Sequence, residues 1–233
     1  MNPIILSDWL PACAAAGVEA VPAEVVLETT KAELAQAMDG ESDLWDAIAL
    51  IIKSEPEGPP QPVMYRWDCC SPGWFKYLMS QGPAAPPVIE AYHFIDDPRL
   101  WDIIDDWNGE AMRLYRRPWV HAVKVDDYPV EFRVFVNDGV VQGVSSYYPQ
   151  RPLPESYRVV AKHAALLTDT LIEHACQAFT ADWLLRASDN KLLFLEGGPP
   201  HLHPVTGPSA HPCCFAPGEI HGVALEPQEG FIA

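Results

Sequence analysis

Two acidic residues on neighbouring predicted strands are the strongest chemical signal in this sequence. Asp182 and Glu196 lie in two apolar segments separated by residues 188–190, Ser-Asp-Asn, which are typical of a hairpin loop. If these three residues form the loop, Asp182 faces Glu196 directly, with Cβ atoms roughly 4.5–5.5 Å apart. Like charges in that arrangement destabilise a sheet, and a divalent cation between them removes the cost. Mg²⁺ is the expected ion, because it accepts carboxylate oxygens and usually completes its shell with nucleotide phosphates.

Two other interpretations of this hairpin remain open. The two acids could belong to a solvated acidic face, each paired with a nearby lysine or arginine. A two-residue loop would instead place them on opposite faces of the sheet, because side chains alternate along a strand.

A second predicted hairpin carries an arginine in the middle of an apolar strand. Arg133 shares one face of the strand with Glu131 and Phe135, and the turn signal Asn-Asp-Gly follows at residues 137–139. A buried guanidinium needs a partner. A phosphate would serve, since it accepts two parallel hydrogen bonds from arginine. An ion pair with Glu131, or with an acid on a neighbouring strand, is the alternative.

Composition limits the classes of function. The chain has 233 residues, 48% of them hydrophobic, and a formal net charge of −17, so it can bury a large core but has no broad basic face for nucleic acid. No apolar run is long enough to span a membrane, and the first residues lack the features of a signal peptide. We therefore expect a cytoplasmic protein whose six cysteines are reduced thiols.

The elements that must position these residues suggest an α+β fold. Short apolar segments typical of strands alternate with amphipathic segments, and residues 156–179 form the clearest predicted helix. We expect two lobes, an N-terminal α/β lobe over residues 1–118 and a C-terminal lobe over 119–233 that ends in a proline-rich tail.

The order of motifs in the second half resembles the ATP-grasp superfamily of ATP-dependent carboxylate–amine ligases. The resemblance is closest to the branch of cell-division-cycle D-family proteins, which assist assembly of translation initiation factor two, and extends to small ATP-grasp proteins of phage and bacteria. It rests on the strand 131–136, the Gly-Val-Ser at 143–145, the Tyr147–Tyr148 pair, the helix at 156–179, and the segments 179–182 and 195–198.

This resemblance implies a fold, two cofactors and a set of residues. The fold is the ATP-grasp fold, with two α+β lobes whose antiparallel sheets enclose a nucleotide cleft, and the cofactors are ATP and Mg²⁺. Asp182 and Glu196 match the metal ligands, and Arg133 matches the arginine that faces the phosphates. The expected nucleotide-binding residues are Arg66, Lys124, Glu131 and Arg133.

Two departures from the family pattern bear on catalysis more than on nucleotide binding. Many members have an asparagine, a third metal ligand, where this chain has Gly198. Arg66 stands where the branch has a lysine, and the two cations differ in shape and hydration.

The activity implied is that of a ligase. A carboxylate attacks the γ-phosphate of ATP to give an acylphosphate, and an amine or other nucleophile then displaces phosphate. Arg133 and Arg151 are the expected catalytic residues, with Arg151 on the acceptor carboxylate. Arg116 and Arg117 are further candidates for that role, although a surface role explains these arginines equally well. The acceptor is expected to be a small molecule or a peptide.

Two alternatives belong to other classes of function. An ATP-binding assembly factor with little or no turnover would recognise a protein partner, as the translation-factor branch suggests. A zinc site in the tail is suggested by residues of ligand type, although their spacing is poor because the two cysteines are adjacent. These residues are His201, His203, His211, Cys213 and Cys214.

Overall fold

The computed structural model describes residues 1–40, 43–54, 63–71, 92–95, 100, 111–148 and 153–200. Contacts divide the chain into two units, which we call the terminal unit, Met1–Val21 with His121–Ala233, and the central unit, Pro22–Val120. The first 21 residues, expected in the N-terminal lobe, thus group with the later part of the chain. No helix among the described residues is both long enough and apolar enough to cross a membrane.

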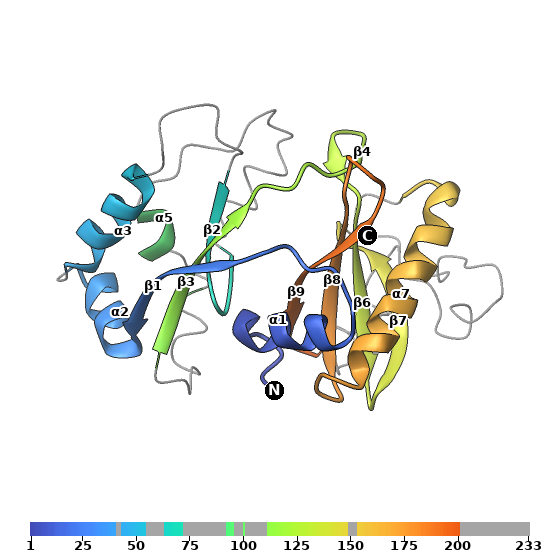
Figure 1. The fold of residues 1–233 in the computed structure, drawn as a ribbon, viewed down its shortest axis with the longest axis horizontal. Coiled ribbons are helices and arrows are strands. Elements are labelled where there is room, and N and C mark those ends of the chain that lie inside the picture. Colours follow the sequence, from blue (N-terminus) through green and yellow to red (C-terminus); the bar gives the residue numbers. More distant parts are fainter. Residues whose placement is uncertain are drawn as a thin grey trace. The chain divides into compact units, whose positions relative to one another are not determined.

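The central unit is built on an antiparallel sheet with strand order β1-β3-β2. Its strands are β1 (Glu24–Thr30), β2 (Val63–Trp67) and β3 (Ala111–Pro118). In Figure 1 its helices lie on one side of this sheet; they are α2 (Lys31–Met38), α3 (Leu44–Lys53) and the short α5 (Tyr92–Ile95).

Local sequence explains where α2 begins. Thr30 Oγ1 accepts a hydrogen bond from the Glu33 backbone N–H at 3.1 Å, and Glu33 Oε2 accepts one from the Thr30 N–H at 2.8 Å. This capping box satisfies two backbone donors that the first turn of a helix leaves without partners. It also ties the helix start to the end of β1.

One face of the central sheet is apolar. Met112 and Leu114 of β3 are fully buried, and so is Trp67 of β2, whose indole N–H donates to the Phe94 carbonyl at 2.6 Å. Because side chains alternate along a strand, the other face receives the residues between them. On β3 these are Arg113, Tyr115 and Arg117.

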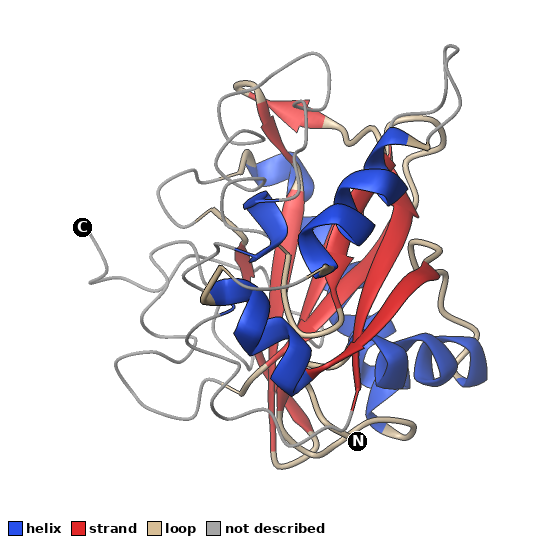
Figure 2. Ribbon diagram, turned by 90° about the vertical axis from the view of Figure 1, so that its left-hand side faces the viewer, coloured by secondary structure: helices blue, strands red, loops and turns tan. Residues whose placement is uncertain are grey.

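The terminal unit is built on an antiparallel sheet with strand order β7-β6-β8-β9. Its helices are α1 (Leu6–Ala15), the 3₁₀ turn η1 (Glu155–Tyr157) and α7 (Arg158–Ile172). Its strands are β4 (Lys124–Val125), β5 (Tyr128–Pro129), β6 (Glu131–Asn137), β7 (Val140–Ser146), β8 (Phe179–Leu185) and β9 (Leu192–Gly198). In Figure 2 the strands are red and the helices blue.

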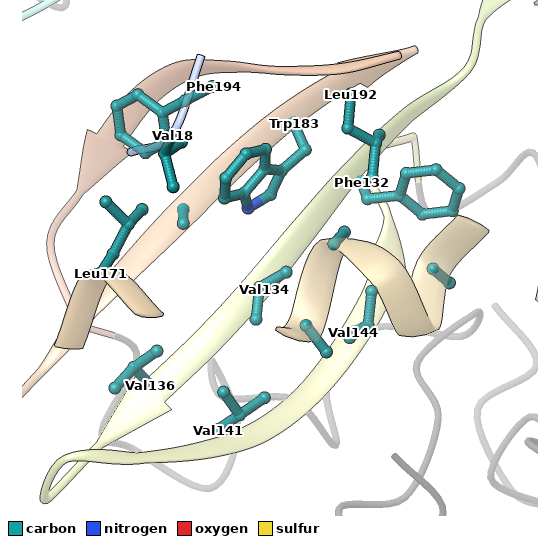
Figure 3. Packing of buried hydrophobic residues seen from close by; sticks show 14 of the residues in the cluster. Val18, Phe132, Val134, Val136, Val141, Val144, Leu171, Trp183, Leu192 and Phe194 are labelled. Atoms are coloured by element: carbon teal, nitrogen blue, oxygen red, sulfur yellow. The ribbon is translucent and has the colours of Figure 1, made fainter. Parts of the chain in front are cut away.

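The core of the terminal unit lies between one face of this sheet and α7 (Figure 3). Phe132, Val134 and Trp183 point to this side, and small residues on α7, such as Ala161 and Ala164, allow close packing of the helix. The Trp183 indole N–H donates to Thr168 Oγ1 at 2.8 Å, so its polar atom is satisfied inside the core.

The first residues of the chain close the outer edge of β9. Phe194 donates its N–H to the Glu19 carbonyl and accepts from the Val21 N–H, each at 3.0 Å, so that residues 19–21 run parallel to the strand. Trp9 of α1 packs its ring against Phe179 and Phe194, with centroids 4.9 and 5.1 Å apart. Covering a strand edge in this way protects it from pairing with other chains.

The predicted long helix is shorter than expected. The sequence predicts it over 156–179, whereas α7 ends at Ile172 and β8 begins at Phe179. Between them the Gln177 carbonyl accepts a hydrogen bond of 2.7 Å from Gly139, in the turn between β6 and β7. A contact with a distant turn thus replaces the last helical turn that the pattern predicts, which local propensity could not reveal.

Candidate functional site

The register of the β8–β9 hairpin confirms that the two acids face each other, as predicted, although the loop and strand geometry that produces this pairing differs from the prediction. Asp182 and Glu196 are directly opposite partners. The three-residue loop is wrong: the Arg186 N–H bonds to the Lys191 carbonyl at 2.8 Å, so the loop contains four residues, 187–190. A four-residue loop alone would put the acids on opposite faces. A β-bulge at Leu195 inserts one extra residue into β9 and restores the shared face.

A row of polar side chains crosses the sheet at this level, and we call it the charged row. Ser145 of β7 pairs with Arg133 of β6, Arg133 pairs with Asp182 of β8, and Asp182 pairs with Glu196 of β9. All four side chains therefore lie on the face opposite the core. Asp182 and Ser145 are buried, whereas Arg133 and Glu196 are partly exposed.

Arg133 and Asp182 form a two-bonded ion pair. Arg133 Nε donates to Asp182 Oδ1 at 2.8 Å, and Nη2 donates to Oδ2 at 2.7 Å. Burial alone lowers the pKa of Arg133, but the carboxylates of Asp182 and Glu196 outweigh it and raise that pKa, so the guanidinium stays charged. Of the alternatives left open by the sequence, a cross-strand ion pair is the partner that the structure gives Arg133.

Three tyrosines form a series of ring contacts that begins at the Arg133 guanidinium. Arg133 Cζ lies 4.7 Å from the centroid of the Tyr147 ring, a cation–π distance. The Tyr148 ring meets Tyr147 and Tyr128 edge to face, with centroids 5.2 and 5.4 Å apart. Burial raises the pKa of Tyr148, and the nearby Glu131 carboxylate raises it further. The aromatic pair at 147–148 was visible in the sequence, but its contact with Arg133 was not predicted.

Glu131 begins β6 on the same face and is buried. Its carbonyl accepts the Tyr147 N–H at 2.9 Å, which holds the end of β7 beside the charged row. The predicted site residues Glu131, Arg133, Asp182 and Glu196 thus lie together on one face of one sheet.

A tight contact accounts for the glycine at position 198. Gly198 lies opposite Thr180, and a Cβ atom at position 198 would lie 2.6 Å from Thr180 Oγ1. Thr180 is itself buried, and its hydroxyl donates to the Pro199 carbonyl at 3.4 Å. The threonine therefore fills the space in which a larger residue at 198 would stand.

The donor set fits Mg²⁺ carried by a nucleotide. Asp182 and Glu196 offer carboxylate oxygens on one face, and no group of three or more candidate ligands occurs among the residues that the structure describes. Mg²⁺ is usually held by one or two carboxylates together with phosphates and water, whereas structural zinc requires four protein ligands. Two facing carboxylates thus suit a metal whose remaining ligands come from a phosphate-bearing molecule.

Three arginines that the sequence analysis named as candidates, Arg66, Arg116 and Arg117, lie in the central unit. Arg66 is only 1% exposed, and it donates from Nε to the Trp67 carbonyl at 3.0 Å and from Nη2 to the Asp68 carbonyl at 3.4 Å. Arg117, on the same face of the sheet, is only 2% exposed, which excludes a surface role for it. Arg116 points to the other face and is partly exposed, 3.9 Å from Glu24.

Lys124, a predicted nucleotide contact, is not part of the charged row. Lys124 is exposed on the small β4–β5 hairpin, whose turn residues Asp126 and Asp127 both have positive φ. Arg151 lies outside the described residues. So does the predicted zinc cluster of His201, His203, His211, Cys213 and Cys214.

Comparison with known proteins provides a fold assignment. No protein-family model and no curated protein matches the sequence. Cdc123 from Schizosaccharomyces pombe is similar in structure, with a TM-score of 0.60 and 14% identity over 97% of this chain and 92% of that one. Its C-terminally truncated form gives 0.57 and 15% identity over the same shares.

A weaker similarity involves N5-carboxyaminoimidazole ribonucleotide synthetase from Thermotoga maritima. Its TM-score is 0.45 at 14% identity, over 99% of this chain and 52% of that one. The fold assignment depends on the two Cdc123 structures, which match nearly the whole of both chains. This chain therefore has the α+β fold of Cdc123, the ATP-grasp fold with antiparallel sheets that the sequence predicts.

Proposed function

We propose that this protein binds ATP together with Mg²⁺ and uses them in ligase chemistry of the ATP-grasp type. The observation that carries the proposal is the charged row, in which Asp182 and Glu196 face one another on β8 and β9 with Arg133 alongside. Two carboxylates and a guanidinium on one sheet face are the groups needed for a divalent cation and the phosphates that accompany it.

In this proposal Asp182, Glu196 and Arg133 of the charged row, and Tyr147 beside the row, have separate tasks. Asp182 and Glu196 hold the metal ion, which when bound neutralises charge on the phosphates. Arg133 binds phosphate oxygens through its planar fork of N–H donors. Tyr147 keeps that guanidinium in place by stacking on it.

The reaction proposed is activation of a carboxylate as an acylphosphate, followed by attack of an amine or another nucleophile. Most of the rate enhancement in such chemistry comes from positioning and from stabilisation of charge, which the row can provide. Arg151 is proposed to bind the acceptor carboxylate. Replacing Arg151 with alanine should raise the acceptor concentration needed for turnover and leave the affinity for nucleotide unchanged.

Calorimetric titration with a non-hydrolysable ATP analogue, with and without Mg²⁺, tests the metal ligands. Asp182→Asn or Glu196→Gln should remove the gain in affinity that Mg²⁺ produces. Asp189→Asn is the matched control, because Asp189 is an exposed acid in the loop of the same hairpin, paired with Arg186. Equal Mg²⁺-dependent binding by the wild type and Asp182→Asn would show that the assignment is wrong.

Arg66, Lys124 and Glu131 remain proposed nucleotide contacts. Single replacements, Arg66→Met, Lys124→Met and Glu131→Gln, should each weaken binding of the ATP analogue in the same titration. Lys124 gives the cleanest result, because its side chain is exposed and its loss leaves the core intact. Unchanged affinity in the Lys124 variant would remove it from the site.

An ATP-binding assembly factor is the second candidate function. It is favoured by the similarity to Cdc123 over 97% of this chain, since the branch that the sequence resembles assists assembly of a translation factor. Thr180 Oγ1, which would lie 2.6 Å from a Cβ atom at position 198, disfavours a third metal ligand at that position and points the same way. Tight ATP binding without phosphate release, across a panel of carboxylates and amines, would favour this function over the ligase.

A further inference from the structure

The two-bonded contact between Arg133 and Asp182 has a consequence for metal binding. Both carboxylate oxygens of Asp182 already accept a hydrogen bond from Arg133, at 2.8 and 2.7 Å, and the Asp182 side chain is only 3% exposed. A divalent cation at Asp182 would therefore have to share the carboxylate with a guanidinium. Two positive groups a few ångströms apart in a partly buried site repel strongly.

Arg133 has donors that the ion pair does not use. Its bonds to Asp182 come from Nε and Nη2, and among the described residues Nη1 makes no hydrogen bond. The Tyr147 ring supports the guanidinium from its face, at 4.7 Å, and this contact does not use the N–H donors along the guanidinium edge. The guanidinium can thus turn its fork towards another anion while its stacking contact remains.

We propose that Arg133 is an internal counter-ion that competes with the divalent cation for Asp182. Before ligands bind, its guanidinium neutralises Asp182 beside Glu196. When the cation binds, the guanidinium gives up that carboxylate and becomes available to the phosphates. The metal and the nucleotide then assist each other's binding, because each compensates a charge that the other would leave exposed.

This inference rests on the proposed metal ligands Asp182 and Glu196, and it adds a regulation of that site. In the absence of nucleotide the cation should bind weakly, because Arg133 opposes it. Removing the guanidinium should strengthen binding of the cation alone. If Arg133 only supported the fold, or only bound phosphate, its loss would not produce that gain.

The experiment uses Mn²⁺ alone as the probe, with free Mn²⁺ measured by electron paramagnetic resonance. Arg133→Met should bind Mn²⁺ at least about tenfold more tightly than the wild type, because a positive charge beside the ion is lost. Arg133→Lys should fall between the two. Arg186→Met is the matched control, since Arg186 is paired with Asp189 in the loop of the same hairpin, and it should match the wild type.

A second variant, Tyr147→Leu, tests the same proposal if Arg133→Met does not fold. Tyr147→Leu removes the stacking support but keeps every charge, and it should raise the affinity for Mn²⁺ by about two- to threefold, since a partly exposed cation–π contact is weak. Tyr147→Phe keeps the ring and should match the wild type. Affinity for Mn²⁺ that is unchanged or lower in both Arg133→Met and Tyr147→Leu would overturn the proposal.

Titration with the ATP analogue distinguishes failure of this proposal from failure of the proposed function. In the wild type, Mn²⁺ should increase the affinity for the ATP analogue, and in Arg133→Met that increase should shrink towards none. If the wild type fails to bind the analogue under any condition, the proposed function is wrong. The Mn²⁺ measurements without nucleotide still decide whether Arg133 opposes the cation.

Discussion

The two units carry sheets of similar design but opposite charge. In each unit one sheet face packs mainly on buried apolar residues, with Arg116 and Glu24 at the end of that face in the central unit, and the other face carries ionisable residues in its middle. On strands β6, β8 and β9 the charged face of the terminal unit carries one arginine and three acids among the described residues, namely Glu131, Arg133, Asp182 and Glu196. Among the described residues of the central unit, the strands of the corresponding face carry three arginines and one acid, Arg66, Arg113, Arg117 and Glu28, and Asp68 follows directly after β2.

The balance of charge on each face determines which class of ligand it attracts. An excess of carboxylates attracts a cation, and an excess of guanidinium groups attracts phosphate or carboxylate. The strands themselves are equivalent as scaffolds, since both sheets are antiparallel. The ligand preference therefore comes from a few side chains on alternate positions, not from the type of sheet.

The greatest change in the free energy of unfolding is expected when one ion pair is broken on the charged face of each unit. Asp182→Ala leaves Arg133 without its carboxylate in a site where Asp182 is 3% exposed and Arg133 21%, and should lower the free energy of unfolding by about 3 kcal/mol. Glu28→Ala removes the partner of Arg113 in a pair that is 56% and 35% exposed, and should cost less than about 1 kcal/mol. Urea denaturation measures both values. Equal losses would contradict the distinction between the two faces.

The next test replaces two neighbouring glycines of β9, one on each face of the terminal sheet, and compares the loss of stability. Gly197→Ala would press a Cβ atom against the indole of Trp9 and should cost about 2–3 kcal/mol, because a core indole cannot move aside. Gly198→Ala meets only Thr180 Oγ1, at 2.6 Å, and should cost about 1 kcal/mol.

Thr180→Ala provides the control for these two variants. Combined with Gly198→Ala it should recover stability, because it removes the atom that the new Cβ atom meets. Combined with Gly197→Ala it should recover nothing. Thermal unfolding of the three single and two double variants checks the pattern, and rescue of Gly197→Ala would show that the two faces are not independent.

A smaller effect concerns alkaline pH and Tyr148, one of the tyrosines beside the charged row. Burial raises the pKa of Tyr148, with a further contribution from Glu131. As the pH passes about 10, a tyrosine in the unfolded chain ionises while Tyr148 in the folded protein stays neutral, so stability falls. Tyr148→Phe should remove about 1 kcal/mol of the loss at pH 11. Urea denaturation at pH 8 and 11 tests this, with Tyr128→Phe as a control for the loss of a neighbouring hydroxyl.

The smallest effect is expected at the capping box of the central unit. Thr30→Ala should lower the free energy of unfolding by about 1 kcal/mol. The Thr30 backbone N–H, with the hydroxyls of Thr29 and Thr30, lowers the pKa of Glu33, so its contribution exists above about pH 4 and is lost as the pH falls through the lowered value. The difference in free energy of unfolding between the wild type and Glu33→Gln should therefore shrink at acidic pH. A difference that does not change with pH would show that the ionised Glu33 carboxylate does not stabilise the cap.

Much of the candidate site was predictable from strand alternation. Arg133 was expected to share a face with Glu131, and Asp182 to share one with Glu196, and the structure confirms both placements. The turn after β6 was also predictable, since Asp138 and Gly139 both adopt positive φ, as the Asn-Asp-Gly signal indicates.

Other features could not be read from the chain. The predicted three-residue loop is wrong, and the acids share a face only because the bulge at Leu195 compensates for the extra loop residue. Nothing in the local sequence identifies such a bulge, because it arises where packing on the two strand faces must be reconciled. Similarly, the grouping of residues 1–21 with the terminal unit depends on the packing of Trp9 against Phe179 and Phe194.

Strand alternation, readable from the chain alone, shows which side chains can act together along each strand, because the direction of side chains alternates with every residue. The chain also indicates that the carboxylates and the arginine fall on strands bounded by turns. Only the tertiary structure decided that Arg133 meets Asp182, a residue 49 positions away, and that Asp182 meets Glu196. Pairing between strands depends on loop length, bulges and the packing of the opposite face, and a single residue of slip would reverse every one of these contacts.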